Sequence, residues 1–410
     1  MSAGGAAKWL RLAVLALVFL LPLVVFPGLS RPFSTPKIFL LEAFVVITGI
    51  YAVSLGLFSR PILPSGFLFS MLIWAFALIV SAAFGEFVSQ QAFWLSLFSM
   101  GWFLLVVALR PNAVYMAAAI SMACAAVAVI VLLQYSGLDP FGLLGWTLNQ
   151  QGGSPRMRIV GTLGNPNFAA ALLVSGMPIA LALGNIYKRQ VFFYIIIALE
   201  ALAVLATGSK AGVIAGLAAL IWLSGLMRLE HRRWIAAGAA AIIIMSVFMP
   251  SRSLLTTIEG RFYIWRVTAS HLLERPFFGF GPGSFAPKYI EWETLYWQNG
   301  HGNDNERKFA QLQAHAHNDY LETLVDNGIA GLLGFVSLLL TFFVFAFRQA
   351  RQAGNELVAG ASAGVVALAV VTLVDFPLHR PAELFFFWTL MSVAYLVCMP
   401  SEAFPTTKTV

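Results

Sequence analysis

Charged side chains are scarce in this sequence of 410 residues. Asp, Glu, Lys and Arg make up 10% of the chain, whereas hydrophobic residues make up 60%. A chain of this length with so little polar surface is not a soluble globular protein, so the composition indicates a polytopic membrane protein. The net charge of +7 does not indicate nucleic-acid binding, because basic residues gather in the cytoplasmic turns of membrane proteins.

Cysteine is also scarce. Cys124 and Cys398 each lie inside an apolar run. Two isolated cysteines provide neither a disulfide framework nor the paired ligands of a zinc site, and they do not indicate the redox compartment.

Twelve apolar runs have about the length that crosses a bilayer core. The sequence therefore predicts an all-α fold with about twelve transmembrane helices, near 9–29, 38–58, 66–84, 91–109, 114–134, 167–186, 191–206, 211–227, 234–250, 328–347, 355–374 and 382–399. Because this number is even, both termini are expected on the same side of the membrane.

Basic residues distinguish the two sides. The ends and turns on the side of the termini hold twelve of them: Lys8, Arg11, Arg60, Arg110, Lys188, Arg189, Arg228, Arg232, Arg233, Arg348, Arg351 and Lys408. The short turns on the opposite side hold six: Arg31, Lys37, Arg156, Arg158, Lys210 and Arg380. Lysine and arginine concentrate in cytoplasmic turns, so the termini are predicted to be cytoplasmic.

One long segment, residues 251–326, collects much of the charge. A segment this polar cannot lie in hydrocarbon, so we expect an outward loop between the membrane helices of 1–250 and those of 327–410, all in one integral-membrane unit. Pro276 and Pro282 interrupt it, which predicts short helices. Four aromatic residues of the loop are interpreted as an interfacial belt rather than as a platform for sugar rings: Tyr289, Trp292, Tyr296 and Trp297.

Basic residues on the outer side depart from the topological bias, so each needs another explanation. Arg156 and Arg158 lead into residues 161–167, where Asn165 and Asn167 can cap a helix or bind a polar ligand.

Lys210 starts a predicted helix after a turn of small residues. This position suits a phosphate, although an interfacial lysine that only snorkels is the commoner case. Further on, the spacing of Arg261, Trp265 and Arg266 fits one or two turns of an interfacial helix with at least one arginine facing a cavity.

Two histidines precede a predicted helix whose first turn holds Asp319 and Glu322. Their spacing is not that of a helical zinc site, so a metal is the less favoured interpretation. A neutral imidazole near the membrane surface suits a general base. The turn that begins at Asn318 is expected to fix His317 and to leave His315 a bystander.

Another outward turn, residues 375–381, combines Asp375, His379 and Arg380. Several such turns on one face, together with the loop, predict a site for an anionic substrate that is carried in the membrane.

Five motifs occur in a characteristic order and spacing: Gly-Thr-Leu-Gly-Asn-Pro-Asn at 161–167, Thr-Gly-Ser-Lys at 207–210, Arg261 followed by Trp265, Gly-Phe-Gly-Pro-Gly at 279–283 and Ala-His-Asn-Asp-Tyr-Leu-Glu at 316–322. Together they resemble the O-antigen ligase and O-antigen polymerase superfamily over roughly residues 155–385. The resemblance implies a C-type glycosyltransferase-like fold in the bacterial inner membrane, with a periplasmic loop. It also implies an enzyme that moves a glycan from undecaprenyl pyrophosphate to a lipid A-core or glycan acceptor, among membrane lipids and without a cofactor or metal.

Carried over position by position, the family's loop arginine falls on Arg261 and its histidine on His317. Its other arginine falls on Lys210, which keeps the charge but loses the planar fork that grips a phosphate. The resemblance thus implies that His317 acts on the acceptor hydroxyl, and Arg261 with Lys210 on the pyrophosphate. Secondary candidates for substrate binding are Arg266, Arg156, Arg158, Asn165, Asn167, Asn318, Asp319, Glu322, His379 and Arg380.

Alternative functions remain open. A polymerase would use the same donor as a ligase, and no motif separates the two. A transporter of anionic lipids or sugars would place charge at mid-membrane, where the apolar runs hold little besides Glu42 and Glu200. A membrane scaffold would lose nothing when His317 is replaced.

Overall fold

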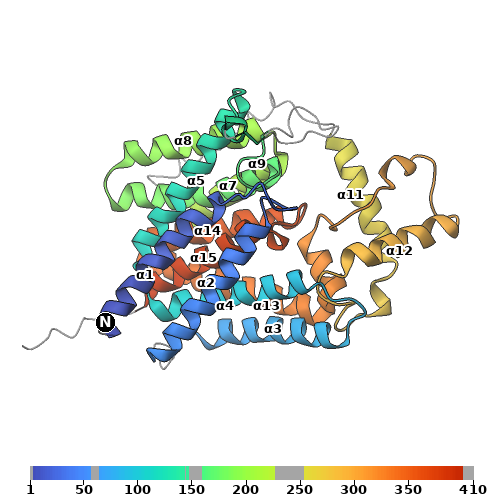
Figure 1. Ribbon diagram of the computed structural model, residues 1–410, viewed down its shortest axis with the longest axis horizontal. Coiled ribbons are helices and arrows are strands. Elements are labelled where there is room, and N and C mark those ends of the chain that lie inside the picture. Colours follow the sequence, from blue (N-terminus) through green and yellow to red (C-terminus); the bar gives the residue numbers. More distant parts are fainter. Residues whose placement is uncertain (1–2, 57–63, 144, 147–158, 227–253, 400–410) are drawn as a thin grey trace, which may run out of the picture.

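The computed structural model describes residues 3–56, 64–143, 145–146, 159–226 and 254–399, which form helices and connecting turns without strands. Figure 1 shows a bundle with α11 and α12 at one end and the start of α1 at the other. The helices are α1 (Ala3–Leu20), η1 (Leu21–Leu23), α2 (Thr35–Ser54), α3 (Ser65–Phe84), α4 (Gln90–Leu109), α5 (Ala113–Tyr135), α6 (Pro140–Leu143), α7 (Pro166–Ile186), α8 (Gln190–Thr207), α9 (Lys210–Leu226), α11 (Leu254–Ala269), η3 (Leu272–Glu274), α12 (Phe285–Gln298), η4 (Arg307–Phe309), α13 (Asp319–Ala353), α14 (Glu356–Val371), η5 (Pro377–His379) and α15 (Pro381–Cys398).

The apolar helices agree with the predicted spans where both can be compared. Within the described ranges, nine helices are long and apolar enough to cross a membrane, and α9 and α14 are shorter apolar helices. Each coincides with one predicted span, whereas the span expected at 234–250 lies outside the described residues. The chain is therefore an all-helical, multi-pass membrane protein.

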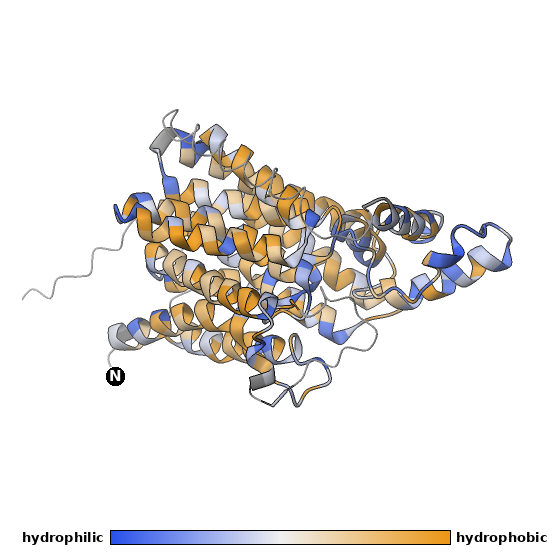
Figure 2. Ribbon diagram, turned by 90° about the horizontal axis from the view of Figure 1, so that it is seen from above, coloured by the Kyte–Doolittle hydropathy of each residue, from blue (hydrophilic) through white to orange (hydrophobic). Residues whose placement is uncertain are grey.

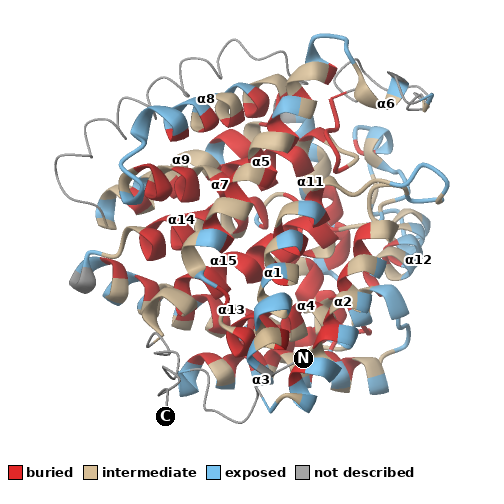
Figure 3. Cartoon of the chain, turned by 60° about the vertical axis from the view of Figure 1, so that its left-hand side comes forward, coloured by how far each residue is buried: buried red, intermediate tan, exposed pale blue. Residues whose placement is uncertain are grey.

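Helices α15 and α7 form the centre of the bundle. Helix α15 packs against α4 and α14, and α7 packs against α5, α8 and α14. Figure 3 shows that buried residues line the inner faces of the helices. Apolar side chains remain exposed on the outer faces, such as Phe39, Ile47 and Ile50 of α2. Figure 2 shows hydrophobic residues along the helices of the bundle and hydrophilic residues near its ends. Such a surface suits hydrocarbon and would aggregate in water.

Helix α13 is broken at Gly328, which has a φ of 64° and a ψ of −168°. A Cβ atom at Gly328 would overlap the backbone of Phe277, so only glycine fits there. The loop supplies hydrogen-bond acceptors for the N–H groups that the break leaves without helical partners. Ile329 and Ala330 donate their backbone N–H groups to the carbonyl oxygens of Pro276 and Phe277 at 2.8 and 3.1 Å. Residues 319–327 are thus a separate helical stretch, held by the loop.

The region from α11 to the start of α13 has its own hydrophobic core. Tyr263 of α11 packs with Phe285, Tyr289 and Trp292 of α12, and all four side chains are buried. The predicted aromatic belt is therefore wrong for Tyr289 and Trp292, because they pack inside the protein and do not face lipid. Tyr296 and Trp297 are partly buried against the same core.

The turn at residues 279–283 joins this region to the bundle. Phe280 accepts hydrogen bonds from the backbone N–H groups of Glu86 and Phe87 at 2.8 and 3.1 Å. Gly281 has a φ of 117°, and a Cβ atom there would overlap the carbonyl oxygen of Phe87. The glycine is required because two stretches of backbone meet with no room for a side chain.

Replacing Gly281 with alanine is expected to destabilise the protein by about 2 kcal/mol or more, since both the backbone conformation and the contact become unfavourable. Thermal unfolding in detergent measures the effect. Gly300→Ala is the matched control, because Gly300 also has a positive φ, of 72°, but no atom lies within 4 Å of its added Cβ. Equal losses of Tm in the two variants would contradict the close packing described for Gly281.

Candidate functional site

His317 forms a pair with a buried carboxylate. Its Nδ1 lies 3.5 Å from Oδ1 of Asp375, at the long end of the range for an ion pair. Asn167 donates its side-chain amide to Oδ2 of the same carboxylate at 3.2 Å. Although burial alone would raise the pKa of Asp375, His317 and the charge of Arg261 lower it below its usual range. Asp375 is therefore a carboxylate placed to stabilise a positive charge on His317.

The backbone at His317 is left-handed, with a φ of 50°. The next residue, Asn318, is extended and caps α13 by accepting a hydrogen bond from the backbone N–H of Leu321 at 3.0 Å. An uncommon conformation next to a capped helix fixes the direction of the imidazole. Its side chain is one-third exposed, so one face of the ring remains accessible.

Helix α11 is anchored to the segment that carries His317. The indole N–H of Trp265 donates to the carbonyl oxygen of Ala316 at 2.9 Å. Arg261, one turn earlier on α11, is half-buried and forms no ion pair with a described carboxylate within 4 Å. Trp265 thus holds this part of α11, and with it Arg261, beside the histidine segment.

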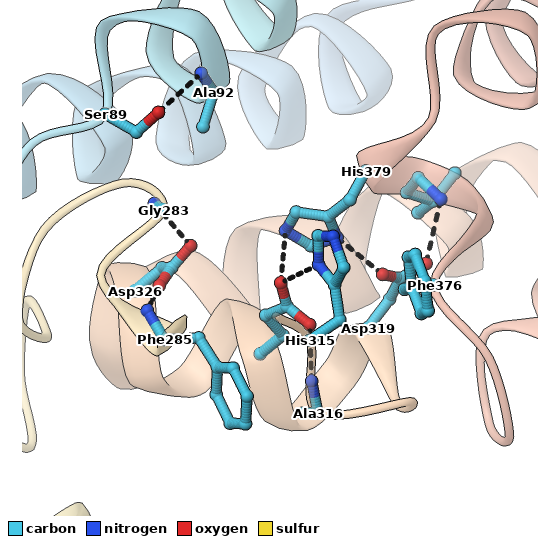
Figure 4. Close-up of polar contacts among 12 residues, drawn as sticks. Ser89, Ala92, Gly283, Phe285, His315, Ala316, Asp319, Asp326, Phe376 and His379 are labelled. Atoms are coloured by element: carbon cyan, nitrogen blue, oxygen red, sulfur yellow. Dashed lines mark hydrogen bonds and ion pairs between the residues drawn. The ribbon is translucent and has the colours of Figure 1, made fainter. Parts of the chain in front are cut away.

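A second network lies next to this pair (Figure 4). His315 Nδ1 contacts Oε1 of Glu322 at 2.7 Å, and Oε2 of Glu322 accepts the backbone N–H of Ala316 at 2.9 Å. His379 Nδ1 contacts Oδ1 of Asp319 at 2.6 Å, and its Nε2 lies 3.5 Å from Glu322. The expectation that His315 is unfixed is therefore wrong, because Glu322 holds it.

The two histidines of this network differ in protonation. Burial alone would lower the pKa of His379, but Glu322 and Asp319 outweigh it and raise the pKa to about 10. Burial lowers the pKa of His315, and the nearby Glu322 opposes this effect only in part. At neutral pH His379 is therefore a cation and His315 is neutral.

The ion network of His379 is expected to make stability fall as the pH rises from neutral to alkaline. The folded protein keeps the proton of His379 up to a pH of about 10, whereas the unfolded chain releases it near 6.5. The stabilisation is complete below pH 6.5 and is lost as the pH rises through about 10. In detergent, His379→Gln should have a lower Tm at neutral pH and a shallower fall toward alkaline pH.

The exposed His301 provides the control for this experiment, since His301→Gln should reproduce the wild-type curve. Parallel Tm curves for the wild type and His379→Gln would show that the network does not hold a proton on His379.

His315, Glu322 and His379 also have the composition of a metal site, with donor atoms within 4.8 Å of one another. The same atoms also form a hydrogen-bonded ion network without a metal, in which His379 contacts Asp319 and His315 contacts Glu322. The short contact between His315 and Glu322 likewise fits a hydrogen bond.

A cavity of about 600 Å³ opens beside this network. His315, Glu322, His379 and Arg380 line it together with Asn165. His317, Arg261 and Lys210 are not among its lining residues. The ring of Phe376 lies between the cavity network and the His317–Asp375 pair. His315 stacks on this ring with the ring centroids 3.9 Å apart, and His317 meets it edge-on with the centroids 5.0 Å apart.

Other predicted site residues have different positions. Arg266 is exposed and paired with Glu306 inside the loop region, so the prediction that it belongs to the site is wrong. Lys210 begins α9 two residues after Gly208, which ends α8 in a left-handed conformation, and it forms no ion pair in the described part of the chain. Asn165 caps α7. The predicted Arg156 and Arg158 lie outside the described residues.

Sequence reasoning missed several residues at this end of the bundle. Asp375 was recognised only as part of a charged turn, although it is the carboxylate partner of His317. Arg31 was used only to assign topology, although it lines the cavity. The sequence does contain a signal for both residues, because each is a charged residue at the end of an apolar run, on the side opposite to the termini in the predicted topology.

The fold and the site define a multi-pass membrane protein with a histidine–carboxylate site at one end of its bundle, near cations that form no ion pair within the described ranges. Residues 193–336 match the family model described as O-antigen ligase, which confirms the resemblance seen in the motifs. The match includes Lys210, Arg261 and His317. No curated protein matches the chain.

Proposed function

We propose that the protein transfers a glycan from undecaprenyl pyrophosphate to the lipid A core at the periplasmic face of the bacterial inner membrane. The family match supports an O-antigen ligase or polymerase type of function in general. The observation that carries the specific proposal is the pairing of His317 with Asp375, next to Arg261, since a base beside a free cation suits hydroxyl attack on a phosphorylated sugar.

In the proposed reaction the acceptor hydroxyl gives its proton to Nε2 of His317, and its oxygen forms the new bond to the anomeric carbon. The bond from that carbon to the pyrophosphate oxygen breaks, and the lipid pyrophosphate leaves with its electron pair. Asp375 stabilises the imidazolium that forms, as the carboxylate does in other histidine dyads. Arg261 and Lys210 stabilise the charge that develops on the leaving group.

The orientation in the membrane is part of the proposal. The excess of basic residues on the side of the termini supports cytoplasmic termini and a periplasmic site. Thiol labelling of Asn299→Cys and Asn305→Cys, two exposed positions of the loop region, should succeed from the periplasm. Labelling only from the cytoplasm would contradict the proposed orientation and would place the loop region in the cytoplasm.

Reconstitution of the purified protein with the undecaprenyl-pyrophosphate glycan and the lipid A core tests the function. Glycan attached to the lipid A core supports a ligase. Lengthened glycan that stays on undecaprenyl pyrophosphate would instead establish a polymerase, and the absence of either product would reject glycosyl transfer.

Lys210 is expected to act as a point charge. Lys210→Arg should keep most of the transfer activity, whereas Lys210→Ala should lose far more than the few tenths of a kcal/mol that an exposed charge contributes. The measurement is the rate of transfer by each reconstituted variant. Near-normal rates in both variants would reduce Lys210 to a snorkelling residue at the interface.

A further inference from the structure

The cavity of about 600 Å³ lies where the N-terminal ends of five long helices meet. Its wall includes residues at or just before the first turns of α2, α4, α7, α12 and α15, among them Ser34, Gln91, Asn165, Gly283 and Arg380. Each helix N-terminus carries a partial positive charge, so their convergence makes the cavity favourable for an anion. Helices α2 and α15 have no side-chain cap, whereas the N-terminus of α12, which has no cap of its own, is covered by the Asp326 carboxylate.

An arginine stands before each of these two uncapped helices. Arg380 lies over the rings of Phe168 and Phe376 at 4.2 and 4.5 Å, and its buried Nε has no hydrogen-bond partner. Arg31 is exposed and reaches only the side chain of Gln91, at 3.5 Å. Across the described ranges, neither arginine has a carboxylate within ion-pair distance. Two cations thus face one cavity with no carboxylate partner among the described residues.

The carboxylates in the cavity wall do not supply that partner. Asp326 accepts hydrogen bonds from the backbone N–H groups of Gly283 and Phe285 at 2.7 and 3.1 Å and from the hydroxyl of Ser284 at 3.0 Å. Glu322 is held by the histidine network described above. Both acidic groups already have hydrogen-bond partners, and the cations Arg31, His379 and Arg380 outnumber them in the cavity wall, so the net charge left for a ligand is positive.

We propose that this cavity binds a phosphoryl group of the lipid that carries the acceptor sugar, and that Arg31 and Arg380 grip it. The inference rests on the proposed function and adds a second anion subsite to it. The donor pyrophosphate is assigned to Arg261 and Lys210, which do not line the cavity. An occupant of the cavity lies one aromatic ring from His317, where an acceptor hydroxyl is needed. Arg31 and Arg380 both lie outside the region that matches the family model.

Transfer kinetics of Arg31→Gln and Arg380→Gln test the assignment. With a phosphorylated acceptor glycolipid, each variant should raise the KM for the acceptor about ten- to hundredfold and leave the KM for the donor unchanged. With an enzymatically dephosphorylated acceptor, the variants and the wild type should have the same KM. Arg307→Gln is the matched control, because Arg307 is exposed, pairs with Asp304 and does not line the cavity.

The opposite kinetic results would overturn the assignment. A rise in the KM for the donor would assign the cavity to the donor pyrophosphate. Unchanged KM values for both the donor and the acceptor would show that no substrate anion binds in the cavity. Arg31 is exposed, so Arg31→Gln keeps the test decisive even where Arg380→Gln fails to fold.

Binding without turnover separates this inference from the proposed function. The His317→Ala protein in nanodiscs should bind the phosphorylated glycolipid, and adding Arg31→Gln should weaken binding at least about tenfold. A wild type that binds this glycolipid but never transfers glycan would reject the proposed function and support the cavity assignment. Equal binding of the dephosphorylated glycolipid, or its displacement by an equal amount of phosphatidylglycerol, would overturn the assignment.

Discussion

His317→Ala is expected to abolish glycan transfer while the protein remains folded in the membrane. The side chain is one-third exposed, so its removal costs little packing, but it removes the base that the acceptor hydroxyl requires. A loss of about 10²- to 10⁴-fold in rate is expected for a general base. Asp375→Asn should also slow transfer, because the imidazolium loses its carboxylate. The measurement is transfer by reconstituted protein, with and without a chelator.

Two histidine variants control this prediction. His301→Ala should be neutral, since His301 lies on an exposed stretch of the loop region. His315→Ala should lose part of the activity, because His315 is bonded to Glu322 in the network beside His317. Full activity of His317→Ala together with inactivity of His315→Ala would reassign the base, and loss of wild-type activity on chelation would favour the metal interpretation.

Arg261→Ala is expected to lower transfer by about 10²- to 10³-fold, the range for removing one donor that stabilises a developing negative charge. Arg261 is half-buried beside Asp375, and no carboxylate in the described part of the chain pairs with it, so its charge is available to a ligand. Arg261→Lys should retain part of the rate, because the charge remains but the two parallel hydrogen bonds do not.

The matched control is Arg266→Ala, on the same helix. Arg266 is exposed and binds Glu306, so its loss should leave the transfer rate within a few-fold of the wild type. Equal losses in Arg261→Ala and Arg266→Ala would indicate a general effect of positive charge on α11, and would remove Arg261 from the reaction.

The membrane helices could be predicted from the sequence because the bilayer sets their length. The runs expected at 114–134 and 167–186 differ by one residue at most from α5 (Ala113–Tyr135) and α7 (Pro166–Ile186). Their ends are also encoded locally, since Asn112 and Asn165 cap the two helices.

Contacts between distant segments could not be predicted in this way. His317 and Asp375 are 58 residues apart, and no local pattern of one sequence shows that they meet. The prediction of an interfacial aromatic belt on α12 was wrong for a related reason. An apolar helix face has the same periodicity whether it packs against lipid or against protein. Tyr289 and Trp292 pack into the hydrophobic core of the loop region. This core includes side chains of α11, whose position next to α12 is not visible in the local sequence.

In the proposed reaction, the break at Gly328 sets the depth in the membrane at which glycan transfer is expected. A straight helix of 35 residues would be about 52 Å long, well beyond the hydrocarbon thickness of about 30 Å. The charged Asp319 and Glu322 are costly in hydrocarbon, so the stretch ahead of the break belongs at the level of the lipid headgroups. A lipid-linked pyrophosphate lies at the same level. In the proposed reaction the donor therefore arrives by lateral diffusion within one leaflet, and its charges never enter the hydrocarbon.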